Sequence, residues 1–308
     1  MQIGFGAPAS GAWATADNLA RFAEQAEELG YASLWTFQRL LVGADQELAP
    51  VYQSVLDPLV ALSFAAARTS RIRLGVAVLN LPFVSPAYLA KQAATLDILS
   101  GGRLDLGLGV GWSSAEFTAT GASTARRAAR TEEYLRVLHT LWADEVSEFA
   151  GEFYTVPPSR MMPKPVQRPG PPVLLGGIVP AAVARAGRIA DGWLSSSGTD
   201  LTRIGAQIET VREAAAEAGK DPAGLRFVCR GVVRAGEPDG LTPDGTRQRL
   251  TGSYEQIRQD AAWLGEQGVT ELFYDLNWDP LIGNPTADPA AAAERAEEIL
   301  RELAPGTH

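Results

Sequence analysis

Glycines crowd the stretch from Gly101 to Gly121, GGRLDLGLGVGWSSAEFTATG, where the pattern indicates a buried strand. Between Arg103 and Val110 the glycines alternate with Leu and Val, and Gly111, Trp112 and a helix start follow directly. A strand this rich in glycine packs poorly by itself, and glycine is favoured where a ligand or another backbone approaches more closely than a Cβ allows. We therefore expect the end of this strand to form the floor of a cofactor site.

A second glycine turn precedes a predicted helix over residues 180–190, and it comprises Gly176, Gly177, Ile178 and Val179. Backbone N–H groups at a helix N-terminus are a common setting for a phosphate. Ser195 and Ser196 follow the next predicted strand and would add hydroxyl donors on the same side. A tight turn between strand and helix, without any ligand, explains the two glycines equally well.

The residue counts exclude several kinds of catalytic site. The chain has two histidines, of which His139 lies in an apolar helical run and His308 is the final residue. A Ser-His-Asp triad, a zinc site and a Cys-x-x-Cys site are therefore not expected, and we predict no metal. The single cysteine, Cys229, excludes an internal disulfide and predicts a cytoplasmic location. An enzyme with this composition would rely on an organic cofactor.

Charge and hydropathy limit the partners. The formal net charge of −9 and the isoelectric point near 4.9 argue against binding to nucleic acid or to anionic membranes. No segment approaches the roughly 18 consecutive apolar residues of a membrane span. A small-molecule substrate is the partner that remains.

Eight strands alternate with eight helices along the 308 residues. The predicted strands are 2–8, 32–37, 72–79, 103–110, 173–175, 192–195, 225–234 and 270–276. The predicted helices are 15–29, 57–70, one after Pro86, 126–142, 180–190, 201–218, 254–267 and 289–303. This alternation predicts an α/β fold, a (β/α)8 TIM barrel with small insertions in a single domain over residues 1–308. A doubly wound sheet is less consistent, because Trp112 occupies the third glycine position of its nucleotide-binding fingerprint.

In such a barrel the active site lies at the carboxyl ends of the strands. Gln38 ends the second strand, where a group that orients the substrate is often placed. Glu116 is interpreted as an acid that offsets a helix dipole. A hairpin insertion around Gly151 is expected over one end of the core, and a polar stretch between Arg234 and Tyr254 is expected beside the site.

The glycine strand, together with ASLWTF before it and PPVLLGGIVPAAVARAGRIADGWLS after it, resembles the bacterial luciferase-like monooxygenase superfamily. More narrowly, it resembles the branch that depends on the deazaflavin coenzyme F420. The resemblance covers nearly the whole chain in the same order. It implies a (β/α)8 barrel that binds the cofactor ring at the carboxyl ends of the strands, and it implies a homodimer formed through barrel helices.

Carried over by position, the resemblance implies a set of ring contacts: Phe37, Leu79, Asn80, Val110, Gly111 and Trp112. It implies that Gly176, Gly177, Ile178 and Val179 contact the phosphate. Many members have a bulge with a non-proline cis peptide at the end of the third strand, and the matching place in this chain is Leu79-Asn80.

The chain also departs from the family's sugar-phosphate dehydrogenases, which carry Asp-His at the end of the second strand and Glu after the fourth-strand glycine. The corresponding residues here are Phe37-Gln38 and Trp112. Without that His and Glu, an acid/base pair for alcohol oxidation is not evident, and Trp112 would shape the pocket. We expect hydride transfer from reduced F420 to an activated alkene, imine or carbonyl, with Gln38 or a nearby hydroxyl orienting the substrate. A monooxygenase that uses reduced FMN and oxygen is the alternative, and a non-catalytic flavin-binding barrel is a third.

Overall fold

The computed structural model describes residues 1–236, 245 and 247–306. Eight parallel strands form a closed barrel in chain order, and the last strand pairs with the first. The barrel strands are β1 (Gln2–Gly6), β2 (Ser33–Thr36), β3 (Arg73–Asn80), β4 (Leu104–Gly109), β7 (Val173–Gly176), β8 (Gly192–Leu194), β9 (Arg226–Val232) and β12 (Glu271–Asp275). The predicted (β/α)8 barrel is confirmed. The polar stretch expected between Arg234 and Tyr254 falls largely on residues 237–244 and 246, outside the described residues.

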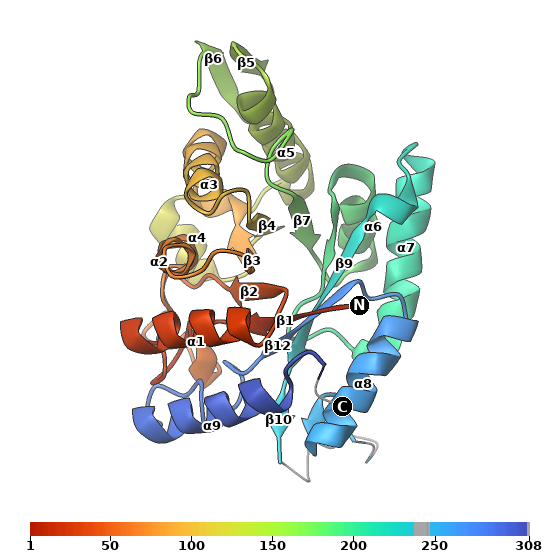
Figure 1. Ribbon diagram of the computed structural model, residues 1–308. Coiled ribbons are helices and arrows are strands. Elements are labelled where there is room, and N and C mark those ends of the chain that lie inside the picture. Colours follow the sequence, from red (N-terminus) through yellow and green to blue (C-terminus); the bar gives the residue numbers. More distant parts are fainter. Residues whose placement is uncertain (237–244, 246, 307–308) are drawn as a thin grey trace.

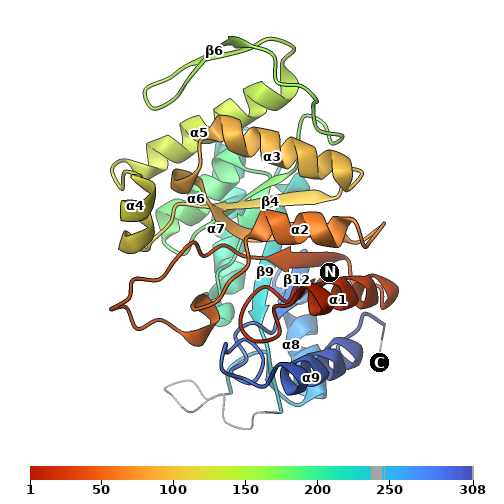
Figure 2. The same ribbon diagram turned by 90° about the vertical axis from the view of Figure 1, so that its left-hand side faces the viewer.

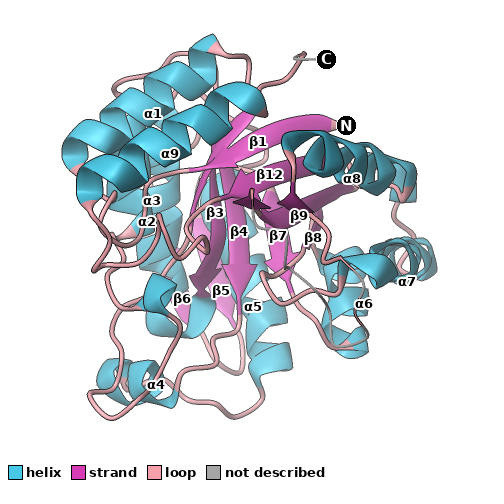
Figure 3. Cartoon of the chain, turned by 90° about the horizontal axis from the view of Figure 1, so that it is seen from below, coloured by secondary structure: helices cyan, strands magenta, loops and turns pink. Residues whose placement is uncertain are grey.

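Helices surround the barrel on its outer side (Figure 3). They are α1 (Ala16–Glu28), α2 (Pro58–Ala66), α3 (Pro86–Leu99), α4 (Ser114–Thr120), α5 (Arg127–Ala143), α6 (Pro180–Ile189), α7 (Ile204–Glu217), α8 (Tyr254–Glu266) and α9 (Pro289–Glu302). Helices α1, α2, α3 and α5 lie side by side in that order (Figures 1 and 2). None of the helices in the described part of the chain is both long and apolar enough to cross a bilayer.

Several helices begin where the sequence places a capping residue. Thr15 is the N-cap of α1 and accepts a hydrogen bond from the backbone N–H of Asn18 at 3.2 Å. Asp57 caps α2 in the same way, and Pro58 occupies the first helical position, where its missing N–H costs no hydrogen bond. These caps define the residue at which each helix begins, and so they limit the loop that joins it to the preceding strand.

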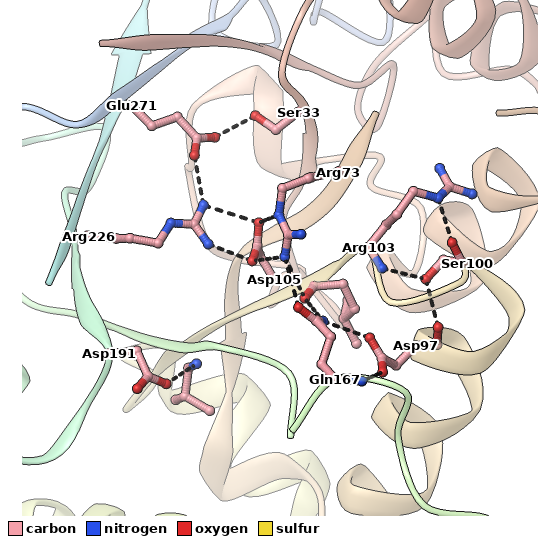
Figure 4. A network of polar contacts seen from close by, with 12 residues as sticks. Ser33, Arg73, Asp97, Ser100, Arg103, Asp105, Gln167, Asp191, Arg226 and Glu271 are labelled. Carbon is pink, nitrogen blue, oxygen red and sulfur yellow. Dashed lines mark hydrogen bonds and ion pairs between the residues drawn. The ribbon is translucent and has the colours of Figure 1, made fainter. Parts of the chain in front are cut away.

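Ion pairs close the amino-terminal end of the barrel (Figure 4). The buried carboxylate of Asp105 on β4 contacts Arg73 on β3 and Arg226 on β9, each at 2.6 Å. Arg226 also contacts Glu271 on β12 at 2.8 Å, and the Oγ of Ser33 on β2 donates to that carboxylate at 2.5 Å. We call these five residues the ionic floor. It joins five strands, and this end of a barrel serves stability rather than catalysis.

Apolar side chains fill the barrel above the ionic floor. The rings of Trp35 and Phe273 stack with centroids 5.2 Å apart and an interplanar angle of 15°. They belong to one inner cluster that also contains Ala77, Leu174, Leu194 and Val228, with Val78 packed against it. The barrel interior is therefore a packed core that leaves no room for a ligand among these side chains, in keeping with the expectation of a site at the carboxyl ends of the strands.

The predicted hairpin insertion consists of β5 (Ser147–Ala150) and β6 (Thr155–Ser159), which pair antiparallel. It lies along the outer face of α5 and not over one end of the core, so that expectation was wrong. The reason is Glu133 on α5, whose carboxylate accepts hydrogen bonds from the backbone N–H groups of residues 152–154. A further short pair, β10 (Arg234–Ala235) and β11 (Thr251–Gly252), follows β9.

Candidate active site

The residues predicted for the site come from separate segments of the chain, and the parallel barrel brings these segments to one end. Phe37 and Gln38 follow β2, Asn80 ends β3, the segment 110–112 follows β4, and the segment 176–179 lies at the end of β7. All of these positions are carboxyl ends of strands. We call this end of the barrel the mouth.

A bulge distorts β3 just before the mouth. The non-proline cis peptide bond joins Ala77 to Val78, two residues before the expected place at Leu79-Asn80, which was therefore wrong. The pairing of β3 with β4 shifts register between Val76 and Leu79 and is regular again at Leu79 and Asn80. The side chain of Leu79 packs in the outer core against the helices, whereas Val78 packs against the inner cluster. Val78 is thus the residue that the bulge directs into the barrel.

The bulge explains the glycines of β4. A Cβ on Gly107 would overlap the carbonyl oxygen of Val76, and a Cβ on Gly109 would lie 2.6 Å from Cγ2 of Val78. On β7, the strand next to β4, a Cβ on Gly176 would lie 3.2 Å from Cγ1 of Val78. Because carbon atoms normally pack 3.5–4.0 Å apart, the glycines give the bulge the space that it needs. Packing within the protein therefore accounts for them, and close approach of a ligand ring stays a prediction.

Gln38 lies at the mouth with one end of its amide already bonded. Its Oε1 accepts a hydrogen bond from the backbone N–H of Asn80 at 2.9 Å, and the residue is partly exposed. With the oxygen held in this way, the NH2 group points elsewhere and acts as a donor. Gln38 can orient an acceptor oxygen of a substrate, and an amide does not transfer protons at ordinary pH.

Arg39 and Glu116 form a buried ion pair that the sequence did not reveal. Nη1 of Arg39 lies 2.7 Å from Oε2 of Glu116, and the two side chains are 3% and 1% exposed. The other oxygen of Glu116 accepts a hydrogen bond from the backbone N–H of Leu40 at 2.7 Å. Glu116 lies in the first turn of α4, as expected, but its main role is to hold the segment after β2 against α4.

Aromatic rings surround the guanidinium group of Arg39. Its Cζ lies 4.6 Å from the ring centroid of Tyr52 and 4.4 Å from that of Trp112. Tyr52 ends a short helix, η1 (Pro50–Tyr52), and its ring meets those of Trp112 and Trp278 edge to face, with centroid distances of 5.8 and 5.3 Å. Trp112 is 56% exposed, so it lies at the surface of the mouth.

A second buried ion pair lies deeper, between Arg230 at the end of β9 and Asp275 at the end of β12. Nε of Arg230 donates to Oδ2 of Asp275 at 2.6 Å, and Nη1 donates to the carbonyl oxygen of Ala77 at 3.1 Å. Its guanidinium lies over the ring of Phe37, with Cζ 4.8 Å from the centroid. Asn277 donates two hydrogen bonds to Oδ1 of Asp275 and so fixes that carboxylate. The Arg230 side chain thus supports both the cis peptide and a predicted ring contact.

The predicted phosphate turn is held at a defined position beside α6. The indole Nε1–H of Trp193 donates to the carbonyl of Gly177 at 3.0 Å, and a Cβ on Gly177 would lie 2.6 Å from Cβ of Ala182. Val179 is the N-cap of α6 and offers no side-chain cap, and Ile178 and Val179 are more than half exposed. The N-terminus of α6 is therefore accessible to an anion.

The two serines predicted beside this turn differ in their surroundings. Ser195 is completely buried, and its Oγ accepts the backbone N–H of Arg230 at 2.9 Å, so it does not offer a hydroxyl to a ligand. That assignment is corrected. Ser196 is partly exposed, and its Oγ accepts the backbone N–H of Gly198 at 3.2 Å. Ser196 therefore stays in the predicted set.

The two buried carboxylates at the mouth are already engaged. Glu116 and Asp275 are each held by an arginine. His139 lies away from the mouth, in the second half of α5 against Trp142, and burial lowers its pKa. Across the described residues, no group of three or more His, Cys, Asp and Glu side chains could hold a metal ion. Among the described residues, the mouth therefore presents donor groups and aromatic faces, and both of its buried carboxylates are paired with arginines.

A protein-family profile described as luciferase-like monooxygenase matches residues 2–270. The chain belongs to this family. An uncharacterised protein of Mycobacterium tuberculosis is 39% identical over 254 residues, which cover 82% of this chain and 78% of that protein. The F420-dependent glucose-6-phosphate dehydrogenase of Kineococcus radiotolerans is 36% identical over 187 residues, which cover 59% and 53% of the two chains. The FMNH2-dependent dimethylsulfone monooxygenase of Pseudomonas putida is 36% identical over 156 residues, which cover 50% and 42%.

Solved structures show the same fold at low sequence identity. The monooxygenase RslO1 of Streptomyces bottropensis superposes with a TM-score of 0.78 at 23% identity and covers 100% of both chains. An F420-dependent secondary alcohol dehydrogenase superposes with a TM-score of 0.75 at 19% identity and covers 98% of both chains. The family thus contains F420-dependent and FMN-dependent enzymes on one barrel.

Proposed function

We propose that the protein is an oxidoreductase in which reduced F420 passes a hydride to a small organic acceptor, an activated alkene, imine or carbonyl. The observation that carries this proposal is the state of the acids at the mouth. Glu116 and Asp275 are bound to arginines, whereas the amide donor of Gln38 is directed away from its anchored oxygen. Removal of a proton from an alcohol needs a base, and reduction of a polarised double bond needs a donor. The mouth suits the second reaction.

The residues present fit a flat ring that ends in a phosphate. The uncapped N-terminus of α6 and the turn at Gly177 would hold the phosphate through backbone N–H groups. The bulge at Val78, together with Phe37, would support the ring above the packed core. When bound, reduced F420 supplies a hydride, that is, two electrons and one hydrogen. Water supplies the proton that completes addition across the double bond, and Gln38 holds the acceptor oxygen.

The alternative is a monooxygenase that uses reduced FMN and oxygen, and the Pseudomonas putida relative favours it. The F420-dependent relative from Kineococcus radiotolerans, which is also 36% identical, favours F420. A barrel that binds a flavin without catalysis would show affinity for a cofactor and no turnover.

The test begins with fluorescence titration of the protein with F420 and, separately, with FMN. Oxidation of reduced F420 is then followed without oxygen in the presence of cyclohex-2-en-1-one or an imine. Tight binding of F420 and acceptor-dependent oxidation are expected. Binding of FMN alone, with oxygen consumption, would overturn the proposal in favour of the monooxygenase.

The role of Gln38 has a matched variant. Gln38→Glu keeps an oxygen for the backbone N–H of Asn80 but removes the NH2 donor. We expect at least a tenfold fall in kcat/KM, which corresponds to about 1.4 kcal/mol, with the Kd for F420 unchanged. An unchanged kcat/KM would remove Gln38 from the mechanism.

We also propose that two copies pair through α2 and α3. Helix α2 is apolar on all sides, and an all-apolar helix is normally buried. Nevertheless Val60 and Phe64 on α2, and Tyr88 on the adjacent α3, are 69%, 41% and 62% exposed. Pairing would cover this face. The cytoplasm remains the proposed location, in keeping with the free thiol of Cys229.

A further inference from the structure

Trp112 has an unusual combination of exposure and support. The residue is 56% exposed, yet one face of its ring is covered by the guanidinium of Arg39, 4.4 Å from the centroid. That guanidinium is held by Glu116 and by the ring of Tyr52, and the ion pair is almost completely buried. We call Arg39, Tyr52, Trp112 and Glu116 the platform. Its support leaves the second face of Trp112 as the surface that a ligand can cover.

Stability alone does not explain the buried ion pair of the platform. A buried ion pair gains little over apolar packing, because two charges must be removed from water. The pair does fix the orientation of an exposed indole, which otherwise samples several rotamers. An aromatic ring that is already ordered loses less conformational entropy when a flat ligand stacks on it. The arrangement therefore fits a binding surface.

The groups beside the platform indicate what the ligand carries. Nε of Arg39 and Nε1 of Trp278 are buried and have no hydrogen-bond partner among the described residues. Both groups lie against Tyr52, through the contacts of Arg39 and of Trp278 with its ring. Nε of Arg39 lies on the covered face of Trp112, out of reach of a ligand on the second face. The indole N–H of Trp278 lies on the far side of Tyr52, and a ligand oxygen beside Tyr52 would satisfy this costly unpaired donor. The nearby carboxylate of Glu116 is paired with Arg39, so it offers no ion pair to a cationic ligand.

We infer that the acceptor is a planar, conjugated ring compound with a carbonyl oxygen, such as a quinone or a cyclic aromatic enone, which stacks on Trp112. This inference rests on the proposed function. When bound, reduced F420 would be oxidised by giving up a hydride to one oxygen of the quinone, and a proton from water would bind the other oxygen. The two C=O bonds of the quinone would thereby become the two C–OH groups of the hydroquinone. Trp112 is a binding residue in this scheme, and Arg39 and Glu116 are positioning residues.

Binding and turnover are measured separately. The oxidised holoenzyme, which cannot reduce a ligand, is titrated by calorimetry with menadione (2-methyl-1,4-naphthoquinone) and with the acyclic but-3-en-2-one. Menadione is expected to bind at least tenfold more tightly. Trp112→Ala is expected to remove this preference, and Trp112→Phe is expected to keep it within threefold. Val146→Ala, at an exposed apolar residue between α5 and β5, is the control and should change nothing.

The positioning residues have a different signature. Glu116→Gln keeps an acceptor for the backbone N–H of Leu40 but removes the charge that holds Arg39. It is expected to raise KM for menadione by at least fivefold with kcat within twofold, and to leave KM for but-3-en-2-one unchanged. A purely structural effect would change both substrates alike and would contradict the assignment.

The outcomes separate this inference from the proposed function. If Trp112→Ala weakens F420 binding as much as menadione binding, Trp112 contacts the cofactor and the inference fails, while hydride transfer stands. If the protein binds only FMN, the proposed function fails, and the same calorimetry on the FMN-loaded protein still tests the platform. Equal affinity for the two probes in the wild-type protein would overturn the inference under either cofactor.

Discussion

Gly109→Ala should destabilise the protein through one identifiable contact. The new methyl group would lie 2.6 Å from Cγ2 of Val78, about 1 Å inside the normal packing distance. The other neighbours of that methyl group are 3.5 Å or more away. Overpacking of this kind typically costs about 1–3 kcal/mol. For a chain of 308 residues, each kcal/mol lowers Tm by roughly 1.5 °C, so a fall of about 3 °C is expected.

Val78→Ala should relieve that contact, because it removes the methyl group responsible. Alone, it leaves a cavity that costs about 1–3 kcal/mol. In the double variant, the two changes should be less destabilising than the sum of their separate effects, by a coupling energy of about 1–3 kcal/mol. The double variant should therefore be no less stable than Val78→Ala alone. The assay is urea unfolding of the wild type, both single variants and the double variant, supported by calorimetric Tm values.

Gly107→Ala is the matched control on the same strand. Its methyl group would overlap the backbone carbonyl of Val76, which no side-chain deletion removes. Val78→Ala should therefore rescue Gly109→Ala and leave Gly107→Ala unrescued. Additive effects at Gly109 and Val78, or equal rescue at both glycines, would refute the conclusion that these glycines accommodate the bulge.

Three further predictions concern other parts of the molecule. Asp105→Asn removes the negative charge that Arg73 and Arg226 share in the ionic floor. It should lower the free energy of unfolding in urea by about 3–5 kcal/mol and leave the Kd for F420 unchanged. A loss below about 1 kcal/mol would contradict this role of Asp105. Burial raises the pKa of Glu133, but hydrogen bonds from three backbone N–H groups outweigh burial and lower it overall. Its ionised form therefore stabilises the fold above the ordinary carboxylate pKa of about 4.3, and this contribution disappears as the pH falls through the lowered value. Glu133→Gln should reduce the loss of Tm between neutral pH and about pH 3, and a parallel pH profile would argue against it. Phe64→Glu on α2 should convert dimers to monomers in analytical ultracentrifugation, whereas an unchanged mass would exclude this face.

The fold was predictable because its signals are local and repeated. Alternating apolar strands and helices, with N-caps such as Thr15 and Asp57, specify where each element begins. The end of the glycine strand and the Gly176-Gly177 turn were expected at the carboxyl ends of the barrel strands, and the structure places both of them there. These inferences need only the spacing of residues along the chain and the rule that parallel strands end together.

The pairings at the mouth were not predictable in the same way. Arg39 and Glu116 are 77 positions apart, and Arg230 and Asp275 are 45 apart, so neither pair leaves a local pattern. The cis bond at Ala77-Val78 depends on how β3 packs against β4, which no single segment encodes. Ser195 was misassigned because a serine at a strand end looks the same in sequence whether its hydroxyl faces a ligand or a neighbouring backbone N–H.

The ionic floor has a consequence for how this barrel can change over time. It ties the starts of five strands together at the end opposite to the mouth, with four of its five residues drawn from the first position of a strand. Mutations in the mouth loops leave the contacts of the ionic floor intact. Different positions of the chain therefore determine the stability of the barrel and its choice of substrate. A gene library randomised only at the mouth should yield mostly folded variants. Proteins that share the ionic floor could therefore change their substrate without first acquiring mutations that restore stability.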